Sequence, residues 1–351
     1  MLRLEQRPAP SVAMGFLSPV IALALTVVFG TLLFVALGKD PLASLKVFFV
    51  TPLENLRGWS EVGLKMVPLL LCALGLAVCY RSNVWNIGAE GQLVVGGVAA
   101  GGMALMAAPD SPRAFFVLVL LAGIAGGMAW AALTAVLRDK FNASEILVSL
   151  MLTYVGGLLL IYLVNGPWKD PKGFNFPYTR TFETVSMVPK LLPGTRLTWG
   201  VVITVGVLAV IWVFIQKSKV GFRLAVAGNA PLAARFAGFS PREGIWMSLL
   251  ICGALAGLAG ALEVAGPLGQ LTPQISPGYG FAAIIVAWLG RLHPGGCVFA
   301  AFIMALIYIG GELSQSRLGM PNAITGVFQG ILLFSLLACD VLINYKIRWK
   351  K

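Results

Sequence analysis

The sequence is dominated by apolar runs that are long enough to cross a lipid bilayer. An α-helix rises 1.5 Å per residue, so about 20 apolar residues cross the ~30 Å hydrocarbon core. The runs are continuous and show no alternation of apolar and polar residues. Because unpaired backbone groups are costly in lipid, the runs predict helices. The ten predicted spans are residues 12–38, 62–80, 84–108, 114–137, 145–165, 198–216, 244–264, 280–292, 297–313 and 322–343.

The composition leads to the same fold class. Of the 351 residues 58% are hydrophobic and only 11% are charged, whereas a soluble domain carries about 25% charged residues. The net charge of +12 is spread between the apolar runs, which favours anionic lipid head groups over nucleic acid as the partner. We therefore expect an all-α polytopic membrane protein with about ten transmembrane helices in one domain, residues 1–351. The eighth run is short, which indicates a broken or tilted helix.

An even number of spans places both termini on one side of the membrane. The segments on that side hold 15 of the 26 basic residues, including the tail residues Lys346, Arg348, Lys350 and Lys351. The positive-inside rule then predicts that both termini are cytoplasmic. Residues 39–61 read as an interfacial segment and residues 217–243 as a cytoplasmic loop. Residues 166–197 read as an external loop, which either contacts a soluble partner or is a lid without one.

A search for catalytic motifs is negative. The sequence contains no GxxxxGK[ST], HExxH or GxSxG pattern. The five cysteines lie in or beside apolar runs and read as small buried hydrophobes, and His293 is the single histidine. We expect neither catalytic residues nor a metal site, so any ATP would have to be bound by another chain.

A polar and glycine-rich stretch precedes the third run. If the helix starts near Ser82, Glu90 lies about 12 Å into it and shares a face with Asn86. A charge at that depth is expensive unless it faces protein or water. The stretch, including Gln92, therefore reads equally well as a polar strip on a translocation path or as a buried network that locks helix packing.

A second polar stretch, residues 217–243, predicts a short helix outside the membrane. Asn229 is expected to cap it, with Pro231 in its first turn. One face is made smooth by Ala233, Ala234 and Ala237, and Gly238 is expected to end the helix. Because a two-turn helix is not stable alone, it must pack on the membrane domain or on a partner.

At these residues the sequence resembles a known family. The pattern Gly228-Asn229-x-x-x-Ala233-Ala234-Arg235-x-x-Gly238 is similar to the cytoplasmic coupling helix of bacterial ABC-importer permeases of the ribose, branched-chain amino acid and nucleoside group. Residues 86–92 (NIGAEGQ) resemble a hallmark of the subgroup paired with nucleoside-binding lipoproteins. Residues 253–260, 278–281 and 290–294 are also similar, so the matches run from about 60 to 335. Trp85 and Trp288 depart from the pattern, which leaves the substrate open.

The resemblance implies an ABC-importer permease fold in the bacterial inner membrane. Its partners would be a cytoplasmic ABC ATPase, a second permease (identical or paralogous) and an external substrate-binding protein. The substrate would be a nucleoside or a simple sugar. No cofactor is expected in this chain, because the partner ATPase would bind the ATP.

The resemblance also assigns roles to residues. ATPase coupling falls to Asn229, Ala233, Ala234, Arg235, Phe236 and Gly238. Arg235 also reads simply as a positive-inside arginine, and Phe236 and Phe239 either dock on the ATPase or sit on the membrane domain. Glu263 and Glu312 are expected at the outer face, as a gate, a binding-protein contact or structural polar residues. The residues expected on the translocation path are Asn86, Glu90, Gln92, Gln270 and Gln274, where neutral glutamines suit an uncharged substrate.

Two other function classes compete with this interpretation. An ion-gradient-driven secondary transporter of a small polar solute needs an intramembrane acid, and Glu90 is the deep candidate. An integral-membrane enzyme needs a nucleophile or a metal set, and the sequence offers none.

Overall fold

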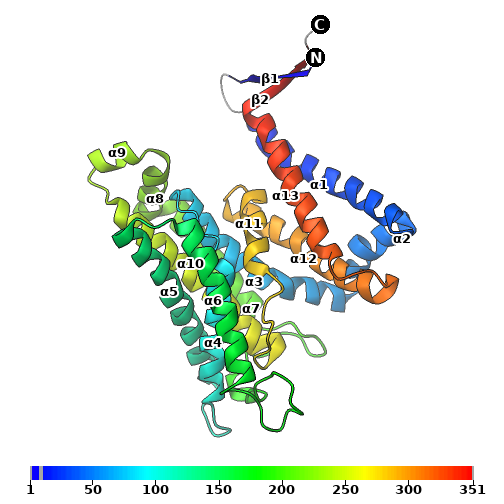
Figure 1. Cartoon of the computed structure of the whole chain (residues 1–351), viewed down its shortest axis with the longest axis vertical. Helices are drawn as coiled ribbons and strands as arrows, with labels where there is room; N and C mark the ends of the chain where they lie inside the picture. The colour runs from blue at the N-terminus through cyan, green and yellow to red at the C-terminus, as the bar shows by residue number, and fades with distance from the viewer. Residues whose placement is uncertain (1, 8–10, 350–351) are drawn as a thin grey trace. The chain divides into compact units, whose positions relative to one another are not determined.

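A computed structural model describes residues 2–7 and 11–349 of the chain, so the tail residues Lys350 and Lys351 lie outside the described residues (Figure 1). Two of the short helices, η1 (Lys46–Val50) and η4 (Val264–Leu268), are π-helical, and η2 (Thr51–Leu53) and η3 (Thr184–Ser186) are 3₁₀-helical. The elements in chain order are β1 (Leu2–Gln6), α1 (Val12–Ala36), α2 (Pro41–Leu45), η1 (Lys46–Val50), η2 (Thr51–Leu53), α3 (Leu56–Arg81), α4 (Ala89–Leu105), α5 (Phe115–Phe141), α6 (Glu145–Asn165), η3 (Thr184–Ser186), α7 (Gly200–Lys217), α8 (Lys219–Asn229), α9 (Pro231–Phe236), α10 (Pro241–Glu263), η4 (Val264–Leu268), α11 (Tyr279–Leu289), α12 (Pro294–Leu318), α13 (Ile324–Asn344) and β2 (Tyr345–Trp349).

The helices confirm the all-α membrane class. Among the described residues, 8 helices are long and apolar enough to cross a membrane, and they coincide with eight of the ten predicted spans. The spans predicted at 84–108 and 280–292 correspond to α4, with 17 residues, and α11, with 11 residues. At 1.5 Å per residue α11 is about 16 Å long, too short to cross the hydrocarbon core. The eighth crossing is therefore broken, as its short apolar run indicated.

The chain forms two compact units. Unit 1 comprises the described residues up to Val62 and from Ile303 onward, and unit 2 comprises Gly63–Phe302. The prediction of a single domain over residues 1–351 stays a prediction.

Unit 1 is built on α1 and α13, which pack together. Its aromatic centre consists of Phe34, Phe48 and Phe328, and the rings of Phe48 and Phe328 stack with centroids 4.3 Å apart. The strand β1 pairs antiparallel with β2, with Leu2 opposite Trp349. The sequence did not predict this ribbon, which joins Leu2–Gln6 to Tyr345–Trp349.

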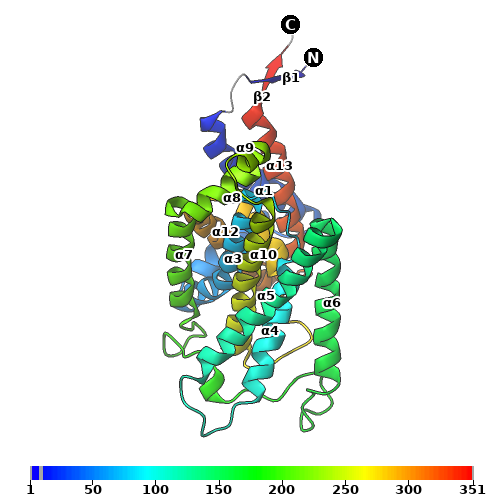
Figure 2. The same cartoon turned by 90° about the vertical axis from the view of Figure 1, so that its left-hand side faces the viewer.

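Unit 2 has a core of α4, α5 and α10, with α6 and α7 on opposite sides of it (Figure 2). The core helices meet at glycines. A methyl group on Gly257 would lie 2.3 Å from the Gly123 carbonyl oxygen, and one on Gly127 would lie 2.2 Å from that of Gly253. These backbones touch directly, because small residues let membrane helices approach each other closely.

The two ends of unit 2 differ. The short helices α8 and α9 lie at one end, and the loop 166–197 lies at the other (Figure 1). At the α8–α9 end, Arg242 of α10 forms a 2.6 Å ion pair with Asp139 of α5, and Trp246 Nε1 donates to the same carboxylate at 3.1 Å. This charged and hydrogen-bonded contact fixes the end of α5 to the start of α10.

Candidate functional site

The N-termini of α4 and α11 meet inside unit 2. Glu90, in the first turn of α4, accepts a 2.6 Å hydrogen bond on Oε2 from the Gly280 amide of α11. The Ser276 hydroxyl, which accepts from the Gly278 amide at 3.1 Å and from the Tyr279 amide at 2.9 Å, belongs to the same turn at the start of α11. Each helix N-terminus carries unpaired amides and a partial positive charge. The buried Glu90 side chain places a hydrogen-bond acceptor where the two N-termini meet.

The stretch before α4 is not helical, so the prediction of a helix from near Ser82 was wrong. Asn83 adopts a left-handed conformation with φ 56°, and the Asn86 Oδ1 accepts a 2.9 Å hydrogen bond from the Gly88 amide. Such side-chain bonds to nearby backbone compete with helix formation. α4 therefore begins at Ala89, and Asn86 does not share a helix face with Glu90.

The amide side chains of this stretch form a buried network. Asn86 is fully buried, and its Nδ2 donates to Gln92 Oε1 at 3.2 Å and approaches the Cys252 sulfur at 3.2 Å. Ser149 of α6 accepts from the Ile87 amide at 3.1 Å. The network joins α4, α6 and α10. Whether Asn86, Glu90 and Gln92 also line a path stays a prediction.

An extended segment, residues 269–278, completes the broken crossing along α4. The side chain of Leu271 lies against Gly101 and that of Ile275 against Gly97, so the segment runs antiparallel to α4. Both side chains are buried, whereas Gln270 and Thr272 are half-buried and Gln274 is exposed. Residues 264–289 contain no charged residue. The segment thus keeps an apolar face on the protein and leaves a neutral polar face free.

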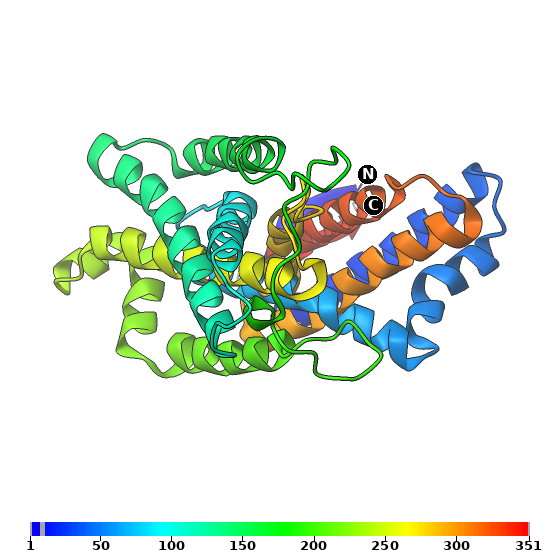
Figure 3. The ribbon, with the colours of Figure 1, turned by 90° about the horizontal axis from the view of Figure 1, so that it is seen from below.

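The loop 166–197 is hydrogen-bonded to the start of this segment, across which it runs in Figure 3. The Thr179 amide donates to the Leu271 carbonyl at 3.1 Å, and the Leu271 amide donates to Thr179 Oγ1 at 2.9 Å. The Phe182 amide donates to the Gly269 carbonyl at 2.8 Å. A displacement of the loop would therefore pull on the broken crossing. No pattern in the sequence pointed to Thr179.

The two predicted outer-face acids lie late in their helices. Glu263 is the last residue of α10 and is half-buried, and Glu312 is exposed six residues before the end of α12. Their roles as a gate or a binding-protein contact stay predictions.

At the other end of unit 2, α9 is exposed on nearly its whole surface. The side chain of Phe236 is 94% exposed and that of Leu232 72%, whereas Ala234 is buried. Ala233 and Arg235 are also exposed. The element that the sequence placed outside the membrane core thus presents apolar and cationic side chains on its surface.

The C-terminal end of α9 is as predicted, and its N-terminal end is not. Asn229 is not its cap: it is the last residue of α8, and the cap position is Ala230, with no side-chain hydrogen bond. Gly238 does end the helix, with φ 76°. The Phe239 amide donates to the Ala234 carbonyl and the Gly238 amide to the Arg235 carbonyl, which is a Schellman motif.

The helix α8 connects α9 to the core of unit 2 through a glycine. A methyl group on Gly228 would lie 2.3 Å from the Arg81 carbonyl oxygen and 3.0 Å from the Asn83 amide nitrogen. The end of α8 therefore rests on the backbone that leads into the Asn86–Gln92 network. Gly228 belongs to the motif that carries the family resemblance, but the sequence did not indicate this contact.

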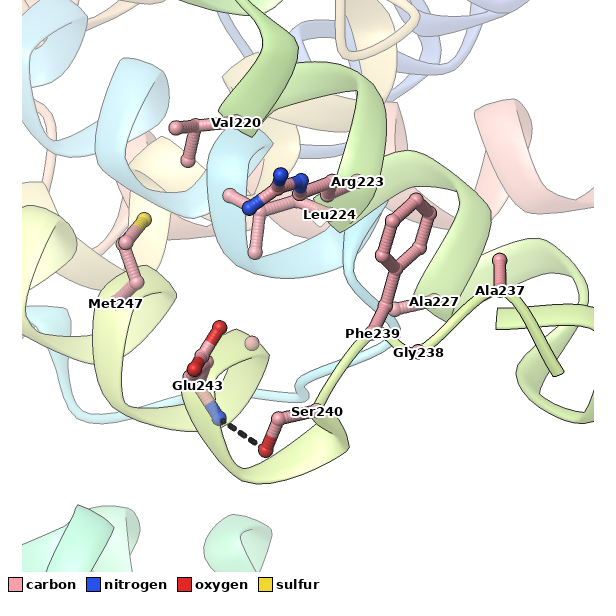
Figure 4. A pocket seen from close by; sticks show the side chains of 11 residues that line it. Val220, Arg223, Leu224, Ala227, Ala237, Gly238, Phe239, Ser240, Glu243 and Met247 are labelled. Carbon is pink, nitrogen blue, oxygen red and sulfur yellow. Dashed lines mark hydrogen bonds between the residues drawn. The ribbon is translucent and has the colours of Figure 1, made fainter. Parts of the chain in front are cut away.

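On its other side α8 is separated from α10 by a cavity of about 260 Å³. Arg223 of α8 and Glu243 of α10 lie on opposite walls, and Phe239 and Met247 also line it (Figure 4). The Arg223 guanidinium lies 5.3 Å from the centre of the Phe239 ring. Phe239 therefore packs back on α8, whereas Phe236 faces outward.

The far end of α11 is held by an aromatic cluster. The rings of Tyr80, Trp85 and Trp288 lie 5.5–5.9 Å apart, so the two tryptophans that depart from the family pattern are neighbours. Arg81 Nε donates to the Leu292 carbonyl at 3.0 Å beside them. The ends of α3 and α11 are joined here.

Comparisons with known proteins find relatives that match most of the chain. A glucose ABC transporter permease protein of Haloferax volcanii is 31% identical over 99% of this chain and 93% of the relative. A guanosine ABC transporter permease protein of Bacillus subtilis is 28% identical over 90% of this chain and 91% of the relative. A nucleoside ABC transporter permease protein of Lactococcus lactis is 26% identical over 91% of this chain and 89% of the relative. The family model described as branched-chain amino acid transport system / permease component matches residues 60–337, and the chain therefore belongs to this family of ABC transporter permeases.

Proposed function

We propose that this permease imports a nucleoside or a simple sugar, driven by a separate cytoplasmic ATPase that docks on α9. In this proposal both termini are cytoplasmic, a second permease completes the pathway, and an external binding protein delivers the substrate at the loop 166–197. The observation that carries the proposal is the exposure of α9, which lies outside the helix core of unit 2.

The surface of α9 is suited to a protein partner. Leu232 and Phe236 are four residues apart, so they lie on one helix face, and both are exposed. Large apolar side chains that gather on a surface mark interaction sites, and aromatic and arginine side chains dominate the energetics of interfaces. Arg235 adds a cation beside Phe236. A six-residue helix is not stable alone, which gives the partner a stabilising role as well.

Motion of α9 has a short physical route to the broken crossing. The next step is α8, whose Gly228 rests on the backbone of Arg81–Asn83. That backbone leads through Asn86 to Glu90, which holds the start of α11 at Gly280. We propose that ATPase closure tilts α8 and shifts the α4–α11 junction, which changes access along the extended segment 269–278.

The free face of this segment supports an uncharged substrate. Gln270, Thr272 and Gln274 offer neutral donors and acceptors, and no charged residue lies between residues 264 and 289. Hydroxyl groups of a sugar or a ribose would pair with such side chains. The names of the relatives, which mention glucose, guanosine and nucleosides, point to the same chemical class.

The docking proposal is tested by co-purification of the ATPase with the full-length permease. We expect Phe236→Ala to reduce the ATPase retained by at least tenfold. The matched control is Phe174→Ala, because Phe174 is also 94% exposed but lies in the loop 166–197 at the opposite end of unit 2. Equal retention by both variants would remove α9 from the docking surface.

The energy source is tested by uptake of labelled guanosine and glucose in cells. Import that stops on deletion of the ATPase gene and persists with a proton uncoupler supports the proposal. The reverse result would support the secondary-transport alternative, in which Glu90 binds the ion.

A further inference from the structure

A second cavity lies at the elbow between α7 and α8. It has a volume of about 410 Å³ and is lined by Lys217, Lys219, Arg223 and the aromatic rings of Phe222 and Phe239. None of the described residues that line it is acidic. The elbow is ordered, because Ser218 Oγ donates to the Phe214 carbonyl at 2.6 Å and accepts from the Gly221 amide at 2.9 Å. Three cationic side chains thus line one open cavity.

The surroundings of the cavity indicate which kind of anion would bind there. It lies where the apolar helix α7 ends at Lys217, which is where a membrane-spanning helix reaches the level of the head groups. One face of α7 is exposed and apolar up to this point, with Val202, Val205 and Val213 at helical spacing. Phe222, 64% exposed, continues the apolar surface beside the cations. An amphiphile with an anionic head and apolar tails matches the cationic cavity and the apolar surface beside it.

We propose that the α7–α8 elbow binds the head group of an anionic phospholipid, with its acyl chains along the exposed valine face of α7. Lys217, Lys219 and Arg223 hold the phosphate, and Phe222 covers the glycerol region. The placement on the cytoplasmic leaflet rests on the proposed orientation. Basic pockets at that surface are known to attract anionic head groups.

The position of the site links it to coupling. Arg223 also lines the cavity between α8 and α10, and it lies over Phe239, which directly follows the glycine that ends α9. A lipid phosphate bound to Arg223 would therefore restrain α8 and Phe239, which flank α9 in the chain. We expect anionic lipid to increase the ratio of ATP hydrolysis with substrate to ATP hydrolysis without it.

The test measures bound lipid directly and does not depend on transport. The full-length permease is equilibrated with vesicles of equal parts phosphatidylglycerol and phosphatidylcholine, extracted, and analysed by native mass spectrometry. We expect phosphatidylglycerol to be retained over phosphatidylcholine in the wild type. In the variant Lys217→Gln/Lys219→Gln/Arg223→Gln we expect retention to fall on the order of a hundredfold, since each basic side chain contributes roughly a fivefold preference.

Two further variants separate the charge of the elbow from folding and from general charge. Lys217→Arg/Lys219→Arg/Arg223→Lys keeps three cations and should retain phosphatidylglycerol. Lys140→Gln/Lys172→Gln/Lys190→Gln removes three exposed lysines elsewhere and should also retain it.

Three results would overturn the proposal. Equal retention of the two lipids by the wild type would do so without any variant. Displacement of phosphatidylglycerol by 10 mM inorganic phosphate would assign the cavity to free phosphate. A glutamine variant that keeps the lipid but loses the ATPase would assign the cavity to a protein segment. Failure of nucleoside or sugar uptake alone would bear on the proposed function and leave the lipid result intact.

Discussion

The carboxylate of Glu90 and the amide of Gly280, which are 190 residues apart in the chain, are joined by a 2.6 Å hydrogen bond where two helices begin. The partial positive charges of the two N-termini face each other across this bond, and they would repel without an anion between them. An ionised Glu90 would be such an anion. A carboxylate is expensive in lipid, but here it is buried in protein and accepts a hydrogen bond from the Gly280 amide. The junction is therefore a hydrogen-bonded contact between the N-termini of α4 and α11.

Glu90→Gln tests this electrostatic role. The glutamine keeps an acceptor oxygen but removes the charge that both N-termini face, so we expect a loss of about 1–3 kcal/mol in folding stability. Glu90→Ala removes the acceptor as well and should lose at least as much. The measurement is the thermal melting midpoint of the purified full-length permease, with the exposed Glu54→Gln as a control. Unchanged melting of both Glu90 variants would show that the junction does not need the charge.

Gly228→Ala tests the route from α9 to the junction. The added methyl group would lie 2.3 Å from the Arg81 carbonyl, and because that atom belongs to the backbone, α8 must shift. We expect ATP hydrolysis to continue while substrate import falls at least tenfold. Gly206→Ala is the matched control, since Gly206 lies inside α7 with no atom near its added methyl group. Comparable import by the two variants would rule out the contact at Gly228 as part of the coupling.

Gln270→Ala and Gln274→Ala test the free face of the extended segment. If each side chain contributes one neutral hydrogen bond to the substrate, its loss is worth about 0.5–1.5 kcal/mol. This corresponds to a KM for uptake that rises about two- to tenfold, with little change in the amount of permease in the membrane. Gln315→Ala, at an exposed position of α12, is the control. A KM like that of the wild type in both variants would place the substrate elsewhere.

The sequence predicted the elements of this fold better than their junctions. Apolar length located the helices, because that signal is local, and the Pro231–Gly238 pattern located α9. The start of α4 was missed because Asn83 adopts a left-handed conformation and the Asn86 side chain binds the Gly88 amide, which stops the helix, although the polar character of both residues fits a helix face as well. The contact of Glu90 with Gly280 joins distant residues, so no local pattern contains it. One available signal was the uncharged stretch 264–280 with its glycines and prolines, which is typical of broken crossings that line a pathway.

Thr179→Val tests the connection between the loop 166–197 and the broken crossing. Thr179 is buried, and its Oγ1 accepts the amide hydrogen bond of Leu271 at 2.9 Å. Valine has a similar shape but no acceptor, so the Leu271 amide would stay buried and unpaired, at a cost of about 1–3 kcal/mol. Because the cost falls on one end of the extended segment, we expect reduced import even where the permease remains folded and retains its ATPase. Thr181→Val changes an exposed neighbour in the same loop and should import normally. If Thr179→Val also imports at the wild-type rate, the loop is a cover that moves independently of the crossing, and delivery of substrate at the loop must act on some other part of the permease.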